Sequence, residues 1–281
     1  MEGKLRDLHL RQSWCYRHPL YELMTESFVA NSTKIGSKKS SDAEKLIILT
    51  GANYSGKSVY IKQVALIVYM AHIGRHDFCN TSISITLCSF VPAEAAEIGL
   101  TDKILSRIQT RESVSKKESA FALDIEQLSH ILRNATESSL VLLDEFGKGT
   151  ATKDGISLFS AVMEHFSYKK DHCPNVLAVT HFHGNKYFCE RINLLEIFHL
   201  RLLDHLPITY YTMEITMPRQ DALTYLYRLV ISFNKKSMLL HRIVKGFSQS
   251  SWGSYCASKA GMPKKIVKRG ISWYFANADN V

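Results

Sequence analysis

Residues 51–58 of this sequence, Gly-Ala-Asn-Tyr-Ser-Gly-Lys-Ser, have the types and spacing needed to hold the phosphate groups of a nucleotide. They fit the pattern G-x-x-x-x-G-K-[S/T], whose glycines let the backbone curl until successive N–H groups face one anion. In this pattern Lys57 reaches the outer phosphates, and the Ser58 hydroxyl is offered to Mg²⁺. The nucleotide-binding candidates are therefore Gly51, Asn53, Ser55, Gly56, Lys57 and Ser58, and Ser58 is also a candidate metal ligand.

A pair of adjacent carboxylates ends a second apolar run, residues 140–143. Asp144 could hold Mg²⁺, and Glu145 could orient and deprotonate an attacking water. Alone, such an acid pair is commonly just the solvated end of a strand. Together with residues 51–58 it supplies the phosphate cradle, the metal ligands and the base that phosphoryl transfer requires. The Asn-Lys pairs of the chain lack the aspartate of guanine-selective motifs, so we expect the nucleotide to be ATP.

His181 follows a third apolar run, residues 176–179. At the end of a strand it could sense the terminal phosphate or the attacking water, but a histidine satisfied within the core is the alternative. Earlier in the chain, Ser119 precedes apolar residues at helical spacing and can cap the start of that helix. Those apolar residues are Phe121, Ile125, Leu128 and Leu132. The sequence therefore leaves the role of His181 open and predicts a helix that begins just after Ser119.

The elements that must position these residues are strands that alternate with helices. The apolar runs 46–50, 140–143 and 176–179 are typical of buried parallel strands. Residues 57–74 are apolar on nearly all faces, which predicts a helix buried between a sheet and its neighbours. This alternation predicts an α/β fold with a mainly parallel sheet flanked by helices.

The strand signal fades after about residue 220. Helical segments around a Gly-Met-Pro turn at 261–263 indicate a small helical appendage. We therefore expect two parts, a nucleotide-binding core at 1–220 and a C-terminal helical segment at 221–281.

The composition is that of an ordinary folded protein. With 281 residues, 46% hydrophobic and 22% charged, the chain is neither disordered nor collagen-like. No apolar run approaches the roughly 20 residues of a membrane span, and residues 1–18 lack a signal peptide, so we expect a soluble, intracellular protein without a membrane partner. Its six cysteines form no C-x-x-C pair, which favours reduced thiols over a zinc site.

Positive charge is concentrated near the C-terminus. The chain carries a net charge of +9, and residues 231–281 hold nine Lys or Arg residues against one Asp. A helical stripe of four of them could contact nucleic acid or simply be a solvated face. The four are Lys264, Lys265, Lys268 and Arg269.

Several motifs resemble those of the MutS family of DNA mismatch-repair ATPases, from about residue 15 to residue 270. Residues 51–58 resemble its phosphate loop, and residues 144–150 resemble its second acidic motif. Further similar segments lie at 17–20, 28–31, 90–99 and 251–263. Two sequence variants resemble the eukaryotic meiotic branch of the family rather than its repair members. They are Tyr54-Ser55 and the residues Phe-Gly-Lys-Gly-Thr that follow the acid pair.

The resemblance implies a P-loop NTPase fold of the ABC-ATPase type and a slow, DNA-dependent ATPase that uses ATP and Mg²⁺ at a subunit interface. Ser119 then matches the serine that completes the partner subunit's site, and His181 matches a histidine beside the γ-phosphate. Phe28 and Val29 match a pair that packs against adenine, although a plain core role is the alternative. In the meiotic branch, two homologues form a heterodimeric clamp on recombination intermediates, which implies DNA as a partner, the nucleus and chromosomes as the location, and dimerisation through residues 221–281.

Some features depart from the family. Residues 75–88 and 232–243 have no counterpart in it, and the chain begins just before the ATPase core, so we expect the arms that encircle DNA to be missing. Two alternatives therefore remain beside a mismatch-repair homologue. One is an interaction module that does not hydrolyse ATP. The other is the head of an ABC-like chromosome-maintenance protein, which usually carries Leu-Ser-Gly-Gly where this chain has Ser119-Ala120-Phe121.

Overall fold

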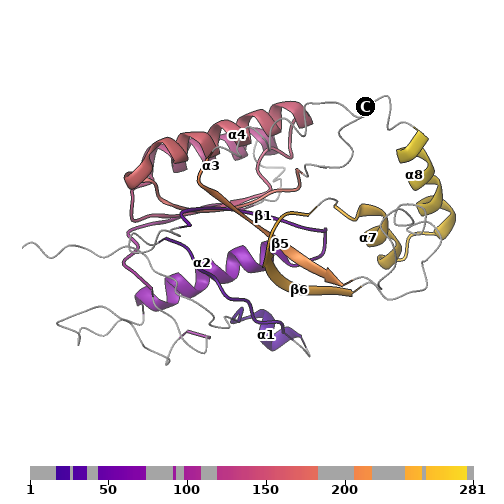
Figure 1. The fold of residues 1–281 in the computed structure, drawn as a ribbon, viewed down its shortest axis with the longest axis horizontal. Helices are drawn as coiled ribbons and strands as arrows, with labels where there is room; N and C mark the ends of the chain where they lie inside the picture. The colour runs from indigo at the N-terminus through magenta and orange to yellow at the C-terminus, as the bar shows by residue number, and fades with distance from the viewer. Residues whose placement is uncertain are drawn as a thin grey trace, which may run out of the picture.

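The structure is a computed structural model that describes residues 17–25, 28–36, 44–73, 91–92, 98–108, 119–182, 206–216, 238–248 and 251–276. These residues form a sheet with helices on both faces (Figure 1). The strands are β1 (Leu46–Thr50), β2 (Ile104–Arg107), β3 (Leu140–Asp144), β4 (Asn175–Val179), β5 (Ile208–Thr216) and β6 (Met238–Lys245). The helices are α1 (Tyr21–Met24), α2 (Lys57–Ile73), α3 (Ala120–Asn134), α4 (Thr152–Tyr168), α7 (Gly253–Lys259) and α8 (Lys264–Ala276), with a 3-10 turn at Lys170–His172. The predicted α/β class is confirmed.

The sheet has six strands in the order β2-β3-β4-β1-β5-β6. All neighbours pair in parallel except β5 and β6, which are antiparallel. The three strands predicted from apolar runs are β1, β3 and β4, and every residue in them is buried. Burial on both faces explains their uninterrupted apolar sequence, because helices cover a parallel sheet on both sides.

Alternate residues of the strands supply two separate cores, since successive side chains of a strand point to opposite faces. On one face, α2 packs against the sheet, and on the other face α3 and α4 do so (Figure 1). The α2 side buries Ile47, Leu49, Leu142 and Val179 against Ile61, Val64 and Val68. The opposite side buries Ile48, Leu143 and Ala178 against Leu128, Phe159 and Phe166. The layers are therefore helix, sheet and helices, with β1, β3 and β4 fully enclosed.

The predicted helix at 57–74 is observed from Lys57 to Ile73, and residue 74 lies outside the described residues. The helix was predicted to be buried between the sheet and its neighbours. Seven of its residues are buried, whereas Tyr69 is 54% and Ile73 is 65% exposed. One side of α2 packs on the sheet, and its apolar residues extend beyond that contact.

The prediction that strands end near residue 220 is wrong. β6 pairs with β5 at the edge of the sheet, and it includes part of the stretch 232–243 that looked foreign to the family. His241, Arg242 and Lys245 broke its apolar pattern, and an edge strand tolerates such residues because one side faces solvent. Helices α7 and α8 do follow, as expected for the C-terminal segment. Residues 75–88 and 221–237 lie outside the described residues.

Every helix among the described residues is too short or too polar to span a membrane. Cys173 and Cys256 are buried free thiols, and the described part of the chain gathers no group of three side chains suited to a metal ion.

Gly155 in α4 packs directly on the loop that follows β3. A Cβ atom at residue 155 would lie 2.3 Å from the carbonyl oxygen of Gly147, and that oxygen belongs to the backbone. We expect Gly155→Ala to lower the free energy of unfolding by about 2 kcal/mol, measured by urea denaturation followed by circular dichroism. Gly270→Ala in α8 is the matched control, since a Cβ there meets nothing within 4 Å. The control should raise the free energy by about 0.5–1 kcal/mol. Equal or greater stability of Gly155→Ala would contradict the described packing.

Candidate functional site

The candidate residues gather where three parallel strands end. β4 lies between β3 and β1, with Val179 beside Asp144 on one side and beside Leu49 on the other. Residues 51–56, the glycine loop, follow β1, while Asp144 ends β3 and His181 comes two residues after β4. The carboxyl edge of a parallel sheet is where such folds usually bind ligands. The structure thus brings these predicted residues to one edge.

The glycine loop curls tightly because two of its residues adopt backbone angles that favour glycine. Gly51 has φ of 140° and Gly56 has φ of 96°. A Cβ atom at residue 51 would lie only 3.1 Å from the Cβ of Met213 on β5. The Ser55 hydroxyl donates to the carbonyl of Ala52 at 2.6 Å and holds the curl together. Glycines are therefore needed here for conformation and space.

Lys57 begins α2, and its side chain is folded into the glycine loop. The residue is 5% exposed, and its ammonium donates to the carbonyls of Gly51 and Ala52, both at 2.9 Å. Burial lowers the pKa of Lys57, and the negative charges of Glu145 and Asp144 oppose that shift. A buried ammonium beside a curled backbone provides a fixed positive charge for an anion.

Ser58 and Asp144, the two predicted metal ligands, contact each other. The Ser58 hydroxyl donates to Asp144 Oδ1 at 3.2 Å. Burial raises the pKa of Asp144, while the bond from Ser58 opposes the rise. A hydroxyl and a carboxylate are both hard oxygen donors, which Mg²⁺ prefers. The residues present therefore fit the ion that the sequence predicted.

Glu145 has a left-handed backbone, with φ of 51°, and its N–H donates to Val179 O at 2.9 Å. Its carboxylate accepts from Lys148 Nζ at 3.0 Å. Burial alone would raise the pKa of Glu145, but the hydrogen bond and charge of Lys148, together with Lys57 and His181, bring it below its ordinary value. Glu145 is therefore an ionised carboxylate next to Asp144, as a base requires.

His181 lies half-buried at the same edge, with its ring centroid 4.3 Å from that of Phe182. Its charge contributes to the lowered pKa of Glu145, so the two side chains share one electrostatic environment. This position is compatible with both interpretations of the residue.

Ser119 is the N-cap of α3, as predicted. Its backbone is extended, with φ of −69° and ψ of 154°, and its Oγ accepts from the N–H of Ala122 at 3.2 Å. The residue is exposed at the start of the helix. Its described hydrogen bond is therefore to its own helix and not to the acid pair.

Arg107, at the end of β2, is a residue that the sequence did not reveal. It is 3% exposed, and its Nε donates to Asp124 Oδ1 of α3 at 3.0 Å. A second guanidinium nitrogen donates to Asp124 Oδ2, and a third donates to the backbone carbonyl of Asp144. β2 has only four residues and no recognisable motif. The one available signal was Asp124, a carboxylate among the apolar positions of a predicted helix.

The segment with Phe28 and Val29 lies beside β6. Asn31 donates to His241 O at 2.8 Å and accepts from the N–H of Ile243 at 2.8 Å. His241 in turn places its Nδ1 2.9 Å from Ser55 O in the glycine loop. Phe28 is half-buried, and Val29 is 38% exposed. β6 thus joins this segment to the glycine loop, a connection that was missed because the strand itself was not predicted.

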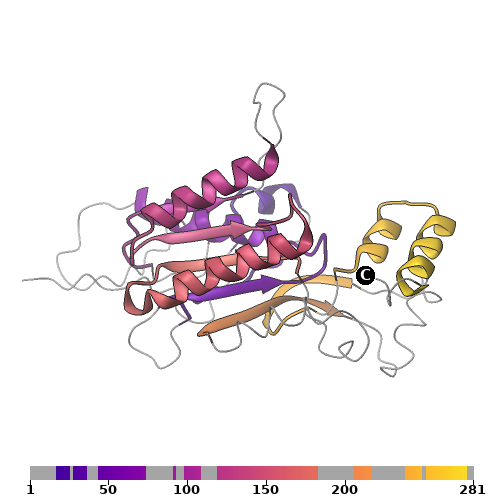
Figure 2. The same cartoon turned by 90° about the horizontal axis from the view of Figure 1, so that it is seen from above.

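Helix α7 and the residues just before it also reach the glycine loop. Asn53 donates its N–H to Ser251 O at 2.9 Å, and Cys256 Sγ donates to Asn53 O at 3.2 Å. Figure 2 shows α7 and α8 together at one end of the sheet. The segment that follows β6 therefore forms hydrogen bonds with both backbone groups of Asn53 in the glycine loop.

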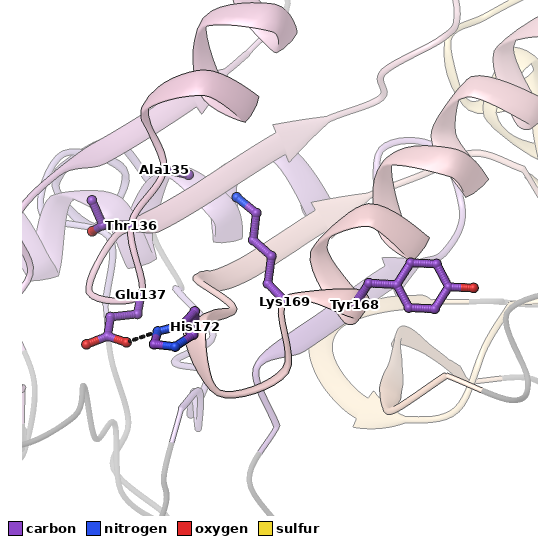
Figure 3. A pocket seen from close by; sticks show the side chains of 6 residues that line it. All are labelled: Ala135, Thr136, Glu137, Tyr168, Lys169 and His172. Atoms are coloured by element: carbon purple, nitrogen blue, oxygen red, sulfur yellow. Dashed lines mark hydrogen bonds and ion pairs between the residues drawn. The ribbon is translucent and has the colours of Figure 1, made fainter.

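An open hollow of about 670 Å³ lies elsewhere, between the C-terminal ends of α3 and α4 (Figure 3). Its lining comes from the turns before β3 and β4, so it opens at the amino edge of the sheet, away from the glycine loop. Two of its polar groups pair with each other, since His172 Nδ1 lies 2.8 Å from Glu137 Oε2, and both side chains are exposed. The hollow is unrelated to the candidate site.

Comparison with known proteins finds similarity along most of the chain. Residues 47–274 match the family profile described as MutS domain V. The chain is 37% identical over 279 residues to MutS protein homolog 5 of Saccharomyces cerevisiae, which covers 90% of this chain and 26% of that relative. It is 36% identical over 256 residues to DNA mismatch repair protein MutS of Dehalococcoides mccartyi, covering 90% of this chain and 24% of that protein.

The chain spans about a quarter of the length of the curated relatives that it matches. The family profile covers most of the chain, including the glycine loop, the acid pair, His181 and α7. The chain belongs to the MutS family.

Proposed function

We propose that this chain binds Mg-ATP at the carboxyl edge of its sheet and hydrolyses it, as the ATPase part of a DNA-acting MutS protein. The observation that carries the proposal is the contact between the Ser58 hydroxyl and the Asp144 carboxylate, 3.2 Å apart, beside the buried ammonium of Lys57. A P-loop ATPase needs these three groups together, because they serve the metal and the phosphates at once.

Each of these residues has a distinct task in phosphate binding. The N–H groups of the glycine loop and the N-terminus of α2 bind the phosphate oxygens. Lys57 exchanges its two backbone carbonyls for phosphate oxygens, while Ser58 and Asp144 hold the metal. Mg²⁺, when bound, draws negative charge from the phosphates and so favours attack on them. Phe28, Val29 and the His241 ring offer apolar and aromatic surface for the adenine, since β6 joins them to the glycine loop.

Glu145 is the general base of the proposed reaction. Its lowered pKa keeps the carboxylate ionised, so it can hold a water and accept its proton. His181, whose charge acts on Glu145, lies on the side of the terminal phosphate in this proposal. The protein thereby orients the water and removes its proton with groups that the sheet already positions.

We place the working site at a dimer interface. Ser119, exposed at the start of α3, meets the nucleotide of the partner subunit. Residues 221–281 and the core at 1–220 both contribute to the dimer interface. ATP then favours a closed dimer, and hydrolysis releases it. The sequence of residues 144–150 resembles the meiotic branch of the family and supports a heterodimer with a second meiotic MutS homologue. This heterodimer would act on DNA recombination intermediates at chromosomes in the nucleus.

Glu145→Gln tests the catalytic assignment directly. The amide cannot accept the water's proton, so we expect ATP hydrolysis to fall by about 10²- to 10⁴-fold while Mg-ATP affinity stays near that of the natural chain. Glu137→Gln at the opposite edge of the sheet is the control and should keep full activity. Steady-state phosphate release and equilibrium binding measure both quantities. Unchanged turnover in Glu145→Gln would refute its role, and a natural chain that binds ATP without hydrolysing it would be an interaction module instead.

Lys148→Met should raise the pKa of Glu145. The variant removes the hydrogen bond and charge that hold this pKa down, so the carboxylate will take up its proton at a higher pH. In the natural chain the pair stabilises the fold above the unfolded-state pKa of the carboxyl, and that contribution is lost as the pH falls through the folded-state value. A carbon-13 NMR titration of the Glu145 carboxyl measures the shift. Lys153→Met, an exposed control on α4, should leave the titration unchanged, and an equal result in both variants would contradict the pairing.

A further inference from the structure

The buried Arg107 connects two elements that serve different parts of the proposed dimer. Through Asp124 it is bonded to α3, the helix that begins at Ser119. Arg107 also donates to the backbone carbonyl of Asp144 at the end of β3, where the proposed metal ligand Asp144 is followed directly by the proposed base Glu145. The Arg107 guanidinium therefore joins α3, the helix proposed to reach the partner's nucleotide, to Asp144 and Glu145, the residues proposed for hydrolysis in this chain.

This connection is costly to break. Arg107 is 3% exposed, Asp124 4% and Asp144 4%, so a displaced partner leaves a buried charge or carbonyl without compensation. Removing one member of a buried ion pair is strongly destabilising, because the other charge is left buried without a partner. A shift of α3 will consequently be passed to the end of β3 rather than absorbed by loss of these bonds.

A second contact also links α3 to the region of the acid pair. The first turn of α3 also packs against the loop after Glu145, because a Cβ atom at Gly149 would lie 3.3 Å from the Cβ of Phe121 and 3.5 Å from its Cα. The absence of a side chain at Gly149 lets the helix approach this closely. α3 is therefore linked to the acid-pair region twice, through the bonds of Arg107 and through the contact of Phe121 with Gly149.

We propose that Arg107 is a positioning residue that couples the two nucleotide sites of the dimer. When Ser119 engages the partner's phosphate, the displacement of α3 passes through Asp124 and Arg107 to Asp144 and sets the geometry of this chain's own Asp144 and Glu145. Hydrolysis in one subunit thus depends on the nucleotide state of the other. This inference rests on the proposed function, since it assumes that Ser119 meets the partner's nucleotide.

The test replaces the ion pair as a unit, because a single substitution would leave a buried charge. The double variant Arg107→Met/Asp124→Leu keeps similar volume with apolar side chains, a change that buried ion pairs often tolerate. In the dimer, we expect its Mg-ATP affinity to stay within about twofold of the natural chain and its kcat to fall roughly tenfold, the size expected for lost coupling. Ser139→Ala is the control, because it removes the 2.8 Å hydrogen bond from the buried Ser139 to Asp102 at the opposite end of β3. It should lower stability without lowering kcat.

Coupling is then separated from a merely structural role by adding Ser119→Ala. In the natural chain this substitution should reduce hydrolysis, whereas in the double variant it should change hydrolysis by less than about twofold, because the route from α3 is already cut. If the two effects simply multiply, or if kcat of the double variant equals that of the natural chain, the proposal is overturned.

A second variant covers the case in which the double variant does not fold. Arg107→Lys keeps a positive charge opposite Asp124, but an ammonium lacks the planar fork that reaches Asp124 and the Asp144 carbonyl together. It should show the same loss of kcat with an unchanged Mg-ATP affinity, and full activity would overturn the proposal. A natural chain without any ATP hydrolysis would instead refute the proposed function, which keeps the two failures distinguishable.

Discussion

The hydrogen bond from the Ser58 hydroxyl to the Asp144 carboxylate joins the two halves of the candidate site, and the geometry of the sheet decides whether it can form. Ser58 lies in the first turn of α2, just after β1, whereas Asp144 ends β3. These strands flank β4 in parallel register, so their carboxyl ends reach the same edge. A shift of β3 by one residue would turn the Asp144 side chain to the opposite face and remove the contact.

Burial of charge is the second constraint on the site. Lys57, Arg107 and Asp144 are each at most 5% exposed, which would be unfavourable without partners. Each has them: Lys57 donates to carbonyls of the glycine loop, Arg107 donates to Asp124, and Asp144 accepts from Ser58. Backbone carbonyls, a carboxylate and a hydroxyl therefore hold these charged groups in place. The hydrogen bond and charge of Lys148, with the charges of Lys57 and His181, lower the pKa of Glu145. The fold itself positions the chemistry that we propose.

The sequence predicted the parts of this arrangement that depend on local pattern. The apolar runs identified β1, β3 and β4, the spacing of residues 51–58 identified the curled loop, and Ser119 was correctly expected to cap a helix. It did not predict β2, β5 or β6, of which β2 and β6 form the sheet edges and mix polar with apolar residues. Arg107 and His241 lie on these unpredicted strands, and each makes its contacts with elements distant in sequence, so neither was predicted. His241, for example, meets Ser55 only because β6 pairs next to β5.

We propose that Ser58 and Asp144 together form a magnesium site that serves ATP. Isothermal titration of ATP into the chain, with and without Mg²⁺, tests it most directly. We expect Mg²⁺ to tighten ATP binding in the natural chain, and we expect Asp144→Asn, which keeps the shape of the side chain but loses its charge, to remove most of this difference. An affinity for ATP that is the same with and without Mg²⁺, or a full effect of Mg²⁺ in Asp144→Asn, would contradict it.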